Sequence, residues 1–176
     1  ARRVVRKMKN SFALTYILLT VAQMILSNYF HFTPFMMMTI LPVMVFCIPT
    51  KIDSVRAMLI AFVTGLAVDF FAEGTLGLNA MSLVPVALLR RPVIGMFFGN
   101  EPFEQKESVT IRKYGFARVS LAIILMTALF LLVYVIADCA GTRPTWFIAT
   151  KLGLSTMASY LASICVINLL AYEDRR

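Results

Sequence analysis

The sequence predicts an all-α, polytopic integral membrane protein, and three observations predict it. Hydrophobic residues make up 60% of the chain and charged residues only 15%, too few to cover a water-exposed surface. The apolar residues gather in runs of about 20, the length that spans a bilayer as a helix. Lysines and arginines fall outside these runs, where they are expected to set the orientation in the membrane.

The apolar runs predict six transmembrane helices in a single domain, 1–176. Irregular backbone in hydrocarbon would leave amides unsatisfied, so each run is expected to be helical. The segment before Pro49 also contains Pro42 and is expected to be a short or kinked span. An apolar stretch at 93–98 is too short to cross and is expected to lie at the membrane surface, followed by a cytoplasmic loop at about 99–117. The six helices are expected at about 12–30, 34–48, 54–71, 76–89, 119–137 and 146–172.

Positive charge predicts the orientation. With the N-terminus in the cytoplasm, 15 of the 17 lysines and arginines lie on the cytoplasmic side, and only Arg143 and Lys151 lie outside. This bias is the positive-inside pattern, and losing one helix would split the basic loops between the two sides. We therefore expect a multi-pass protein of an inner (cytoplasmic) membrane with both termini in the cytoplasm. The basic 90–118 loop would face the cytoplasm and contact anionic lipid or a cytoskeletal component; its candidate residues are Arg90, Arg91, Arg112 and Lys113.

The same residues argue against several other classes. The net charge of +8 does not form a basic stripe interleaved with aromatics, so nucleic acid is not an expected partner. No Walker loop, GxGxxG, HExxH or GxSxG is present, and His31 is the single histidine, so we expect neither an enzyme nor a cofactor. An intramembrane enzyme that uses Asp69 alone is the alternative. Apolar packing, not metal binding, is expected of Cys47, Cys139 and Cys165.

Asp69 is the residue that departs most from the apolar pattern. A carboxylate at a helix centre costs roughly 2.5 to 3.5 kcal/mol on insertion scales, and less near the interface. Small residues let a second helix approach closely, so we expect a packed contact that ends in a carboxylate near the outer face. The competing interpretation, above all for Glu73, is an acidic helix end solvated by headgroup water. Steps of four residues align one side of this helix: Ala57, Ala61, Gly65, Asp69 and Glu73.

Lys151 is the candidate partner of Asp69, because it lies about one turn inside the outer end of the last helix. With Asp138 and Arg143 it would complete an external cluster of charges. The alternative is a lysine that extends to the membrane surface on its own. Gln23 makes the outer half of the first helix mildly polar. The last helix carries a stripe suited to close packing and interhelical hydrogen bonds, formed by Ser155, Ser159 and Ser163.

The segment TGLAVDFFAEGTLGLNA resembles the family of the rod shape-determining protein MreD. The family pattern is a glycine, apolar residues and an aspartate, then a Leu-Gly-x-Asn-Ala-like turn that opens the next helix. Arg91 and Pro92 are similar to the Arg-Pro ending of the equivalent helix in Bacteroidetes-type members. The resemblance covers about residues 54–113. The chain departs from the pattern in the long AEGT insertion and in the doublet of Arg90 with Arg91. The residues that match the pattern are Gly65, Asp69, Gly77 and Asn79.

The motif also has a physical interpretation. Gly65 permits close approach of two helices, Gly74 and Gly77 permit a tight reversal, and Asn79 is placed to cap the next helix with Asp69 within reach. We therefore expect a rigid polar corner at the outer face.

The resemblance implies a non-enzymatic scaffold of the peptidoglycan elongation machinery (the elongasome) that maintains rod shape. Its partners would be a single-span MreC-like protein, and with it the actin-like MreB, RodA and a transpeptidase. MreD proteins are also similar in shape to the substrate-binding S-components of energy-coupling-factor vitamin transporters, which is the alternative function. Such a protein needs a ligand cavity near the outer face, for which the candidate lining is Trp146, Tyr29, Gln23 and Asn79.

Overall fold

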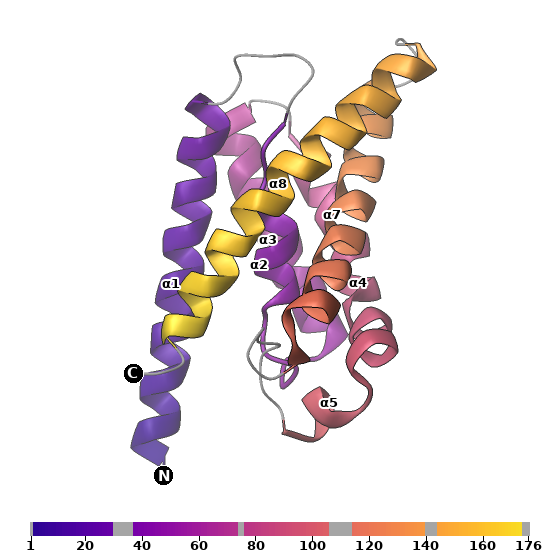
Figure 1. Cartoon of the computed structure of the whole chain (residues 1–176). Helices are drawn as coiled ribbons and strands as arrows, with labels where there is room; N and C mark the ends of the chain where they lie inside the picture. The colour runs from indigo at the N-terminus through magenta and orange to yellow at the C-terminus, as the bar shows by residue number, and fades with distance from the viewer. Residues whose placement is uncertain (1, 30–36, 74–75, 106–113, 140–143, 174–176) are drawn as a thin grey trace.

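The protein is a bundle of helices (Figure 1), seen in a computed structural model that describes residues 2–29, 37–73, 76–105, 114–139 and 144–173. Five of the described helices are long and apolar enough to cross a membrane. The start of α1 and the end of α8 lie toward the same end of the bundle in Figure 1. In chain order the elements are α1 (Arg2–Tyr29), α2 (Leu41–Phe46), α3 (Ser54–Val68), the π-helix η1 (Asp69–Glu73), α4 (Leu78–Phe98), α5 (Glu101–Gln105), α7 (Phe116–Cys139) and α8 (Thr145–Glu173).

The outer surface of the bundle is apolar. Large hydrophobic side chains on every long helix are exposed, among them Leu14 on α1, Val63 on α3 and Met96 on α4. An apolar surface this extensive is unfavourable in water but suits hydrocarbon. The all-α, polytopic membrane class is therefore the class of this fold.

The second predicted helix differs most from the structure. Where the sequence predicts a helix over 34–48, the described part is helical only over the six residues Leu41–Phe46. Residues 37–40, which we call the extended stretch, are not helical. Pro42 lies in the first turn of α2, where a missing N–H is tolerated, and Pro49 follows soon after the last turn. A helix of this length does not span a bilayer.

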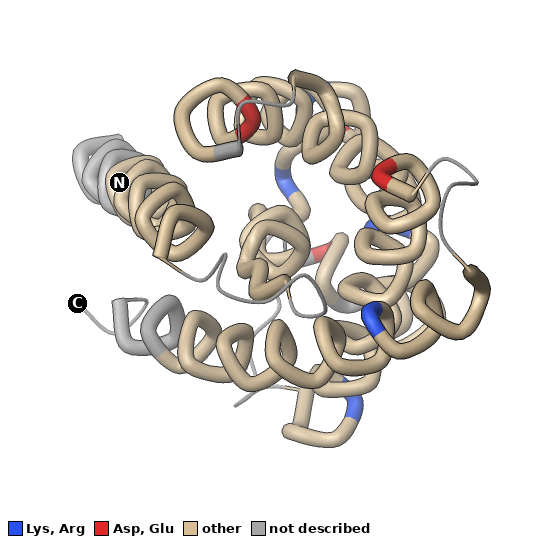
Figure 2. Tube along the Cα trace, turned by 90° about the horizontal axis from the view of Figure 1, so that it is seen from above, with Lys and Arg blue, Asp and Glu red and all other residues tan. Residues whose placement is uncertain are grey.

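The short helix α2 lies at the centre of the molecule. All its residues are buried, and it contacts α1, α3, α4, α7 and α8. Seen from above in Figure 2, the other helices surround it. The second pass is therefore an extended stretch and a short helix enclosed by the longer ones. Such backbone is compatible with a membrane only because protein surrounds it.

The fourth predicted helix is longer in the structure. We expected a helix over 76–89 and a separate surface segment at 93–98, but α4 runs without a break over Leu78–Phe98, with Pro85 and Pro92 inside it. Prolines inside membrane helices are tolerated because neighbouring groups satisfy the freed carbonyls. As a result, Arg90 and Arg91 belong to a helix and not to a loop. The expected loop at 99–117 contains α5, and α7 begins within it.

The remaining predicted helices at 54–71, 119–137 and 146–172 each fall within one continuous helical stretch: α3 with η1, α7, and α8. The helix predicted at 12–30 is α1, which begins earlier, at Arg2. Arg112, Lys113, Arg143 and His31 lie outside the described residues.

Candidate functional site

Asp69 is buried and fully bonded where α3 passes into η1. Its side chain is 0% exposed. Oδ2 accepts the backbone N–H groups of Gly77 at 2.9 Å and Ala80 at 3.3 Å. Oδ1 accepts both the backbone N–H of Asn79, at 3.0 Å, and its side-chain amide, at 2.9 Å. A carboxylate carries acceptors only, so it matches a set made entirely of donors.

This carboxylate caps α4 from a neighbouring helix. The first amides of a helix have no partner within it, and the N-cap residue of α4, Gly77, has no side chain to supply one. Its φ of 103° lies in the left-handed region that favours glycine. Asp69 supplies the missing acceptor, and its negative charge faces the positive end of the α4 dipole. We expected Asn79 to provide the cap; instead its side chain donates to Asp69.

Gly65 permits the close contact between α3 and α4. A Cβ atom built there would lie 2.5 Å from the Cα of Ala80 and 2.6 Å from its backbone nitrogen. Any side chain at this position would therefore collide with the α4 backbone. Ala57, Ala61 and Gly65 are all buried, so the predicted small-residue stripe is a helix contact that leads to the buried Asp69. We call Gly65, Asp69, Gly77, Asn79 and Ala80 the Asp69 corner.

The π-helix η1 carries both the buried Asp69 and two exposed aromatic residues. Its five residues, Asp69–Glu73, have the wider turn that occurs in single-turn π-bulges, often at functional sites. Asp69 points inward, while Phe70 and Phe71 are 67% and 68% exposed. Their rings meet edge to face with centroids 5.1 Å apart. Glu73 closes η1, and its side chain lies outside the described part, so the choice between its two interpretations stays open.

Lys151 pairs with Asp138 and not with Asp69. The Nζ atom lies 2.8 Å from Oδ2 of Asp138, with side-chain exposures of 13% and 39%. This pair joins the facing ends of α7 and α8 where the connection between them begins. Asp138 and Lys151 are two members of the external charge cluster that the sequence predicts, and the third, Arg143, lies outside the described residues. The hydrogen bonds of Asp69 come from residues 77–80 instead.

Three side chains on α1 and α8 hold the extended stretch before α2. The backbone amides of this stretch have no helical partners and use side-chain oxygens instead. The bonds are Met37 N–H to Ser155 Oγ at 2.9 Å, Thr39 N–H to Ser159 Oγ at 3.0 Å and Ile40 N–H to Gln23 Oε1 at 2.8 Å. Sequence reasoning marked Gln23 and the serine stripe as polar but missed what they bind, because the stretch was expected to be helical.

Arg90 lies in the interior, contrary to its predicted place in a loop. It is 1% exposed, and its Nη2 donates to the carbonyl of Pro49 at 3.3 Å. Its Nη1 has no partner among the described residues. Arg91 instead points to the surface, where its Nη2 lies 3.3 Å from Oδ1 of Asp53. The sequence carries no signal that distinguishes the two neighbours, because both follow the same apolar run.

The residues proposed to line a vitamin cavity do not converge. Trp146 and Tyr29 are 64% and 69% exposed, whereas Gln23 and Asn79 are 0% exposed. Gln23 accepts a bond from the backbone before α2, and Asn79 donates its amide to Asp69 while its Oδ1 has no partner among the described residues. These four side chains therefore form no shared lining.

Cys47 and Cys139 are buried, as expected for apolar packing, whereas Cys165 is exposed. Within the described ranges, no group of three or more histidine, cysteine or acidic side chains is arranged to hold a metal ion.

Comparison with protein-family models, with curated proteins and with solved structures gave no match. The arrangement that remains for a functional argument is the Asp69 corner, with the exposed aromatic residues beside it.

Proposed function

We propose that this chain is a non-enzymatic scaffold of the bacterial cell-wall elongation machinery, similar to MreD. The observation that carries the proposal is the Asp69 corner. The four motif residues that resemble the MreD pattern meet in one hydrogen-bonded unit. Asp69 receives all its hydrogen bonds from the chain itself. A carboxylate used in this way stabilises a helix junction and has no oxygen turned toward a substrate, which favours a structural role over an enzyme that uses Asp69.

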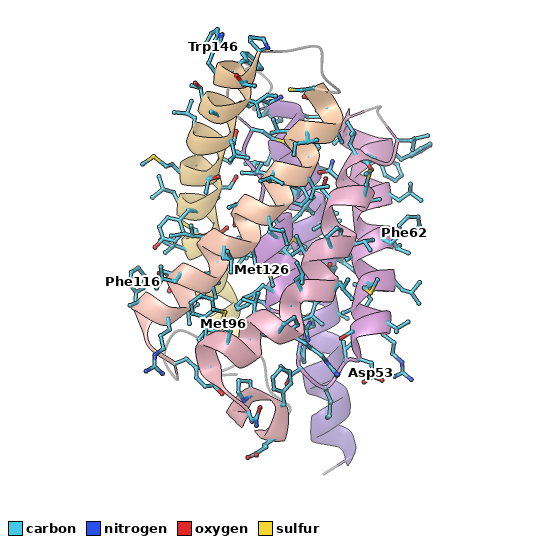
Figure 3. All side chains as sticks on the ribbon, turned by 90° about the vertical axis from the view of Figure 1, so that its right-hand side faces the viewer. Asp53, Phe62, Met96, Phe116, Met126 and Trp146 are labelled. Atoms are coloured by element: carbon cyan, nitrogen blue, oxygen red, sulfur yellow. The ribbon has the colours of Figure 1, made fainter. Side chains whose placement is uncertain are left out.

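In the proposed orientation, both termini are in the cytoplasm and the Asp69 corner faces the outside of an inner membrane. The distribution of Lys51, Arg56 and Arg91 supports this orientation. Arg91 pairs with Asp53, and Figure 3 places Asp53 at the end of the bundle opposite Trp146. This is the end at which α1 begins and α8 ends. Cationic residues on one side of a membrane protein are typical of the cytoplasmic side.

The proposed partner surface consists of Phe70, Phe71 and Leu76. These residues flank the Asp69 corner and are 67%, 68% and 67% exposed. Rigid aromatic side chains are frequent anchors at interfaces and at the membrane surface. Asp69 and Gly77 of the corner directly flank the segment that carries them, and the two residues are joined by a hydrogen bond. We propose that it receives the transmembrane helix of a single-span, MreC-like protein, and that MreB, RodA and a transpeptidase join through that complex.

A pull-down of the MreC-like partner from detergent-solubilised membranes tests this function. Phe70→Ala with Phe71→Ala should reduce partner recovery at least fivefold, because the exposed anchors are lost while the corner is intact. Asp69→Ala should also reduce recovery, because it releases the start of α4. The matched control is Leu59→Ala with Val63→Ala, two exposed apolar residues on α3. This variant should leave recovery unchanged.

Equal recovery with the aromatic pair variant and with wild type, at equal expression, would remove the proposed partner surface. Retention of a vitamin by the purified wild-type protein would instead support the S-component function.

A further inference from the structure

A second surface feature lies at the other end of the bundle, between α4 and α7. It is a groove of about 200 Å³ between these two membrane-spanning helices, and it opens away from the centre of the bundle. Figure 3 views this face, with Met96 on α4 and Met126 on α7. The groove is lined only by apolar side chains: Leu89, Pro92, Val93, Met96, Leu125, Met126 and Leu129.

We propose that this groove binds one acyl chain of an anionic phospholipid whose headgroup lies beside Arg118. The proposal needs only that the bundle lies in a membrane, and it does not rest on the scaffold function. Both walls are helices that span the hydrocarbon region, so the groove faces lipid along its length. Methionine side chains adapt to irregular apolar shapes, and Met96 is 81% exposed at the rim of the groove.

The lining favours an acyl chain over the helix of another protein. Helix contacts in membranes use small residues that let two backbones approach, and this groove contains only leucine, proline, valine and methionine. A flexible hydrocarbon chain can lie along such a lining, whereas a rigid helix needs small residues for close contact.

Charge at the end of the groove favours an anionic headgroup. Arg118 is exposed near the start of α7 and precedes Leu125 by about two helical turns, so both lie on the same face of the helix. Arg118 makes no ion pair with any residue in the described ranges, whereas Arg91 on α4 is paired with Asp53. A phosphate here would face a guanidinium that makes no ion pair within the described residues.

Native mass spectrometry of the delipidated, detergent-solubilised chain tests this inference. We would titrate it with phosphatidylglycerol and, separately, with phosphatidylcholine that carries the same acyl chains. Wild type should bind one phosphatidylglycerol in preference to phosphatidylcholine. Val93→Trp should weaken binding of both lipids at least tenfold, because the indole fills the groove. Arg118→Gln should weaken phosphatidylglycerol binding about fivefold and leave phosphatidylcholine binding unchanged, as expected for one juxtamembrane cation.

Matched controls use the same substitutions elsewhere. Val63→Trp places an indole on the exposed face of α3, where the valine is 63% exposed, and Arg56→Gln removes another exposed cation of α3. Both variants should bind phosphatidylglycerol within twofold of wild type.

The proposal is overturned if Val93→Trp binds lipid as wild type does, or if wild type shows no headgroup preference. It is also overturned if wild type is a dimer that Val93→Trp dissociates, because a second copy would then occupy the groove. One measurement needs no variant. Glycerophosphoglycerol, which has the headgroup without acyl chains, should fail to compete with phosphatidylglycerol, and competition by it would contradict an acyl-chain site.

Discussion

Asp69 replaces, with one side chain, several groups that a helix start normally needs. The left-handed Gly77 leaves α4 without a side-chain cap of its own. The carboxylate from α3 supplies both oxygens, so the start of α4 depends on a residue eight positions earlier that bonds the Gly77 amide. Gly65 makes this possible because it lets the two backbones approach. Removing either residue should therefore disturb both helices at once.

Gly65→Ala should destabilise the protein, although alanine is the better helix former. The added methyl group would lie 2.5 Å from the Cα of Ala80 and push α4 away, at a cost on the order of 1 to 3 kcal/mol for overpacking. The measurement is unfolding in mixed micelles titrated with SDS, followed by circular dichroism. The control, Gly153→Ala on α8, has nothing within 4 Å of the new atom and should be stabilising by about 0.5 to 1 kcal/mol. Similar changes in the two variants would argue against close contact at Gly65.

At the scale of single residues, the sequence was informative where a charged or unusually small residue stands in an apolar segment. A carboxylate at the end of an apolar run and glycines in register indicated a packed polar corner, and Asp69 and Gly65 do form one. It could not indicate which group binds which, so it offered Lys151 as a candidate partner of Asp69, whereas Lys151 pairs with Asp138. Arg90 and Arg91 were assigned alike, because only the rotation of α4 against Pro49 turns one inward and leaves the other at the surface.

At the scale of elements, the central feature is the second pass. An extended stretch and α2 take the place of a spanning helix, and α1 and α8 supply the acceptors that the missing helical bonds would have provided. The prolines around 34–48 signalled an interruption. Hydrophobic pattern alone could not separate a short buried helix from a spanning one, because both are apolar on every side. The joining of 76–89 with 93–98 into α4 was missed for a related reason: a proline in a membrane helix does not have to end it.

Ser159→Ala should destabilise the central pass by about 1 to 3 kcal/mol, because it leaves the buried Thr39 N–H without its acceptor. Hydrogen exchange of the Thr39 amide should accelerate, and SDS unfolding should shift in parallel. Thr156→Val on the same helix is the control, since this hydroxyl donates to the carbonyl of Leu152 in its own helix. In Thr156→Val, the Thr39 amide should exchange as it does in wild type. Unchanged protection of Thr39 in Ser159→Ala would show that the serine does not hold the extended stretch.

At the scale of the whole molecule, the path of the chain brings the start of α1 and the end of α8 to one end of the bundle (Figure 1). Between them the described chain runs along the long helices and through the extended stretch and α2. The sequence predicted the all-α membrane class from hydropathy, and the assignment of this end to the cytoplasm stays a prediction from charge. The sequence could not predict that one crossing is interior, because that depends on how the other helices pack around it.

Topology reporters placed after Gln105 and after Cys139 should give opposite results. A fluorescent protein that matures only in the cytoplasm should be fluorescent after Gln105 and dark after Cys139, and alkaline phosphatase should show the reverse activity. The physical reason is that α5 lies at the end where α1 begins, while the end of α7 and the start of α8 lie at the opposite end (Figure 1). Phosphatase activity after Gln105 would reverse the proposed orientation and place the Asp69 corner in the cytoplasm.

The position of α2 also bears on transport. Its six buried side chains occupy the axis along which an ion or solute would have to travel through the ring of longer helices. A path along this axis would require α2 to be displaced. The hydrogen bonds from the backbone before α2 to Ser155, Ser159 and Gln23 would then break. In the described part of the chain, α2 therefore fills the axis of the bundle, and a solute could pass there only if α2 moved.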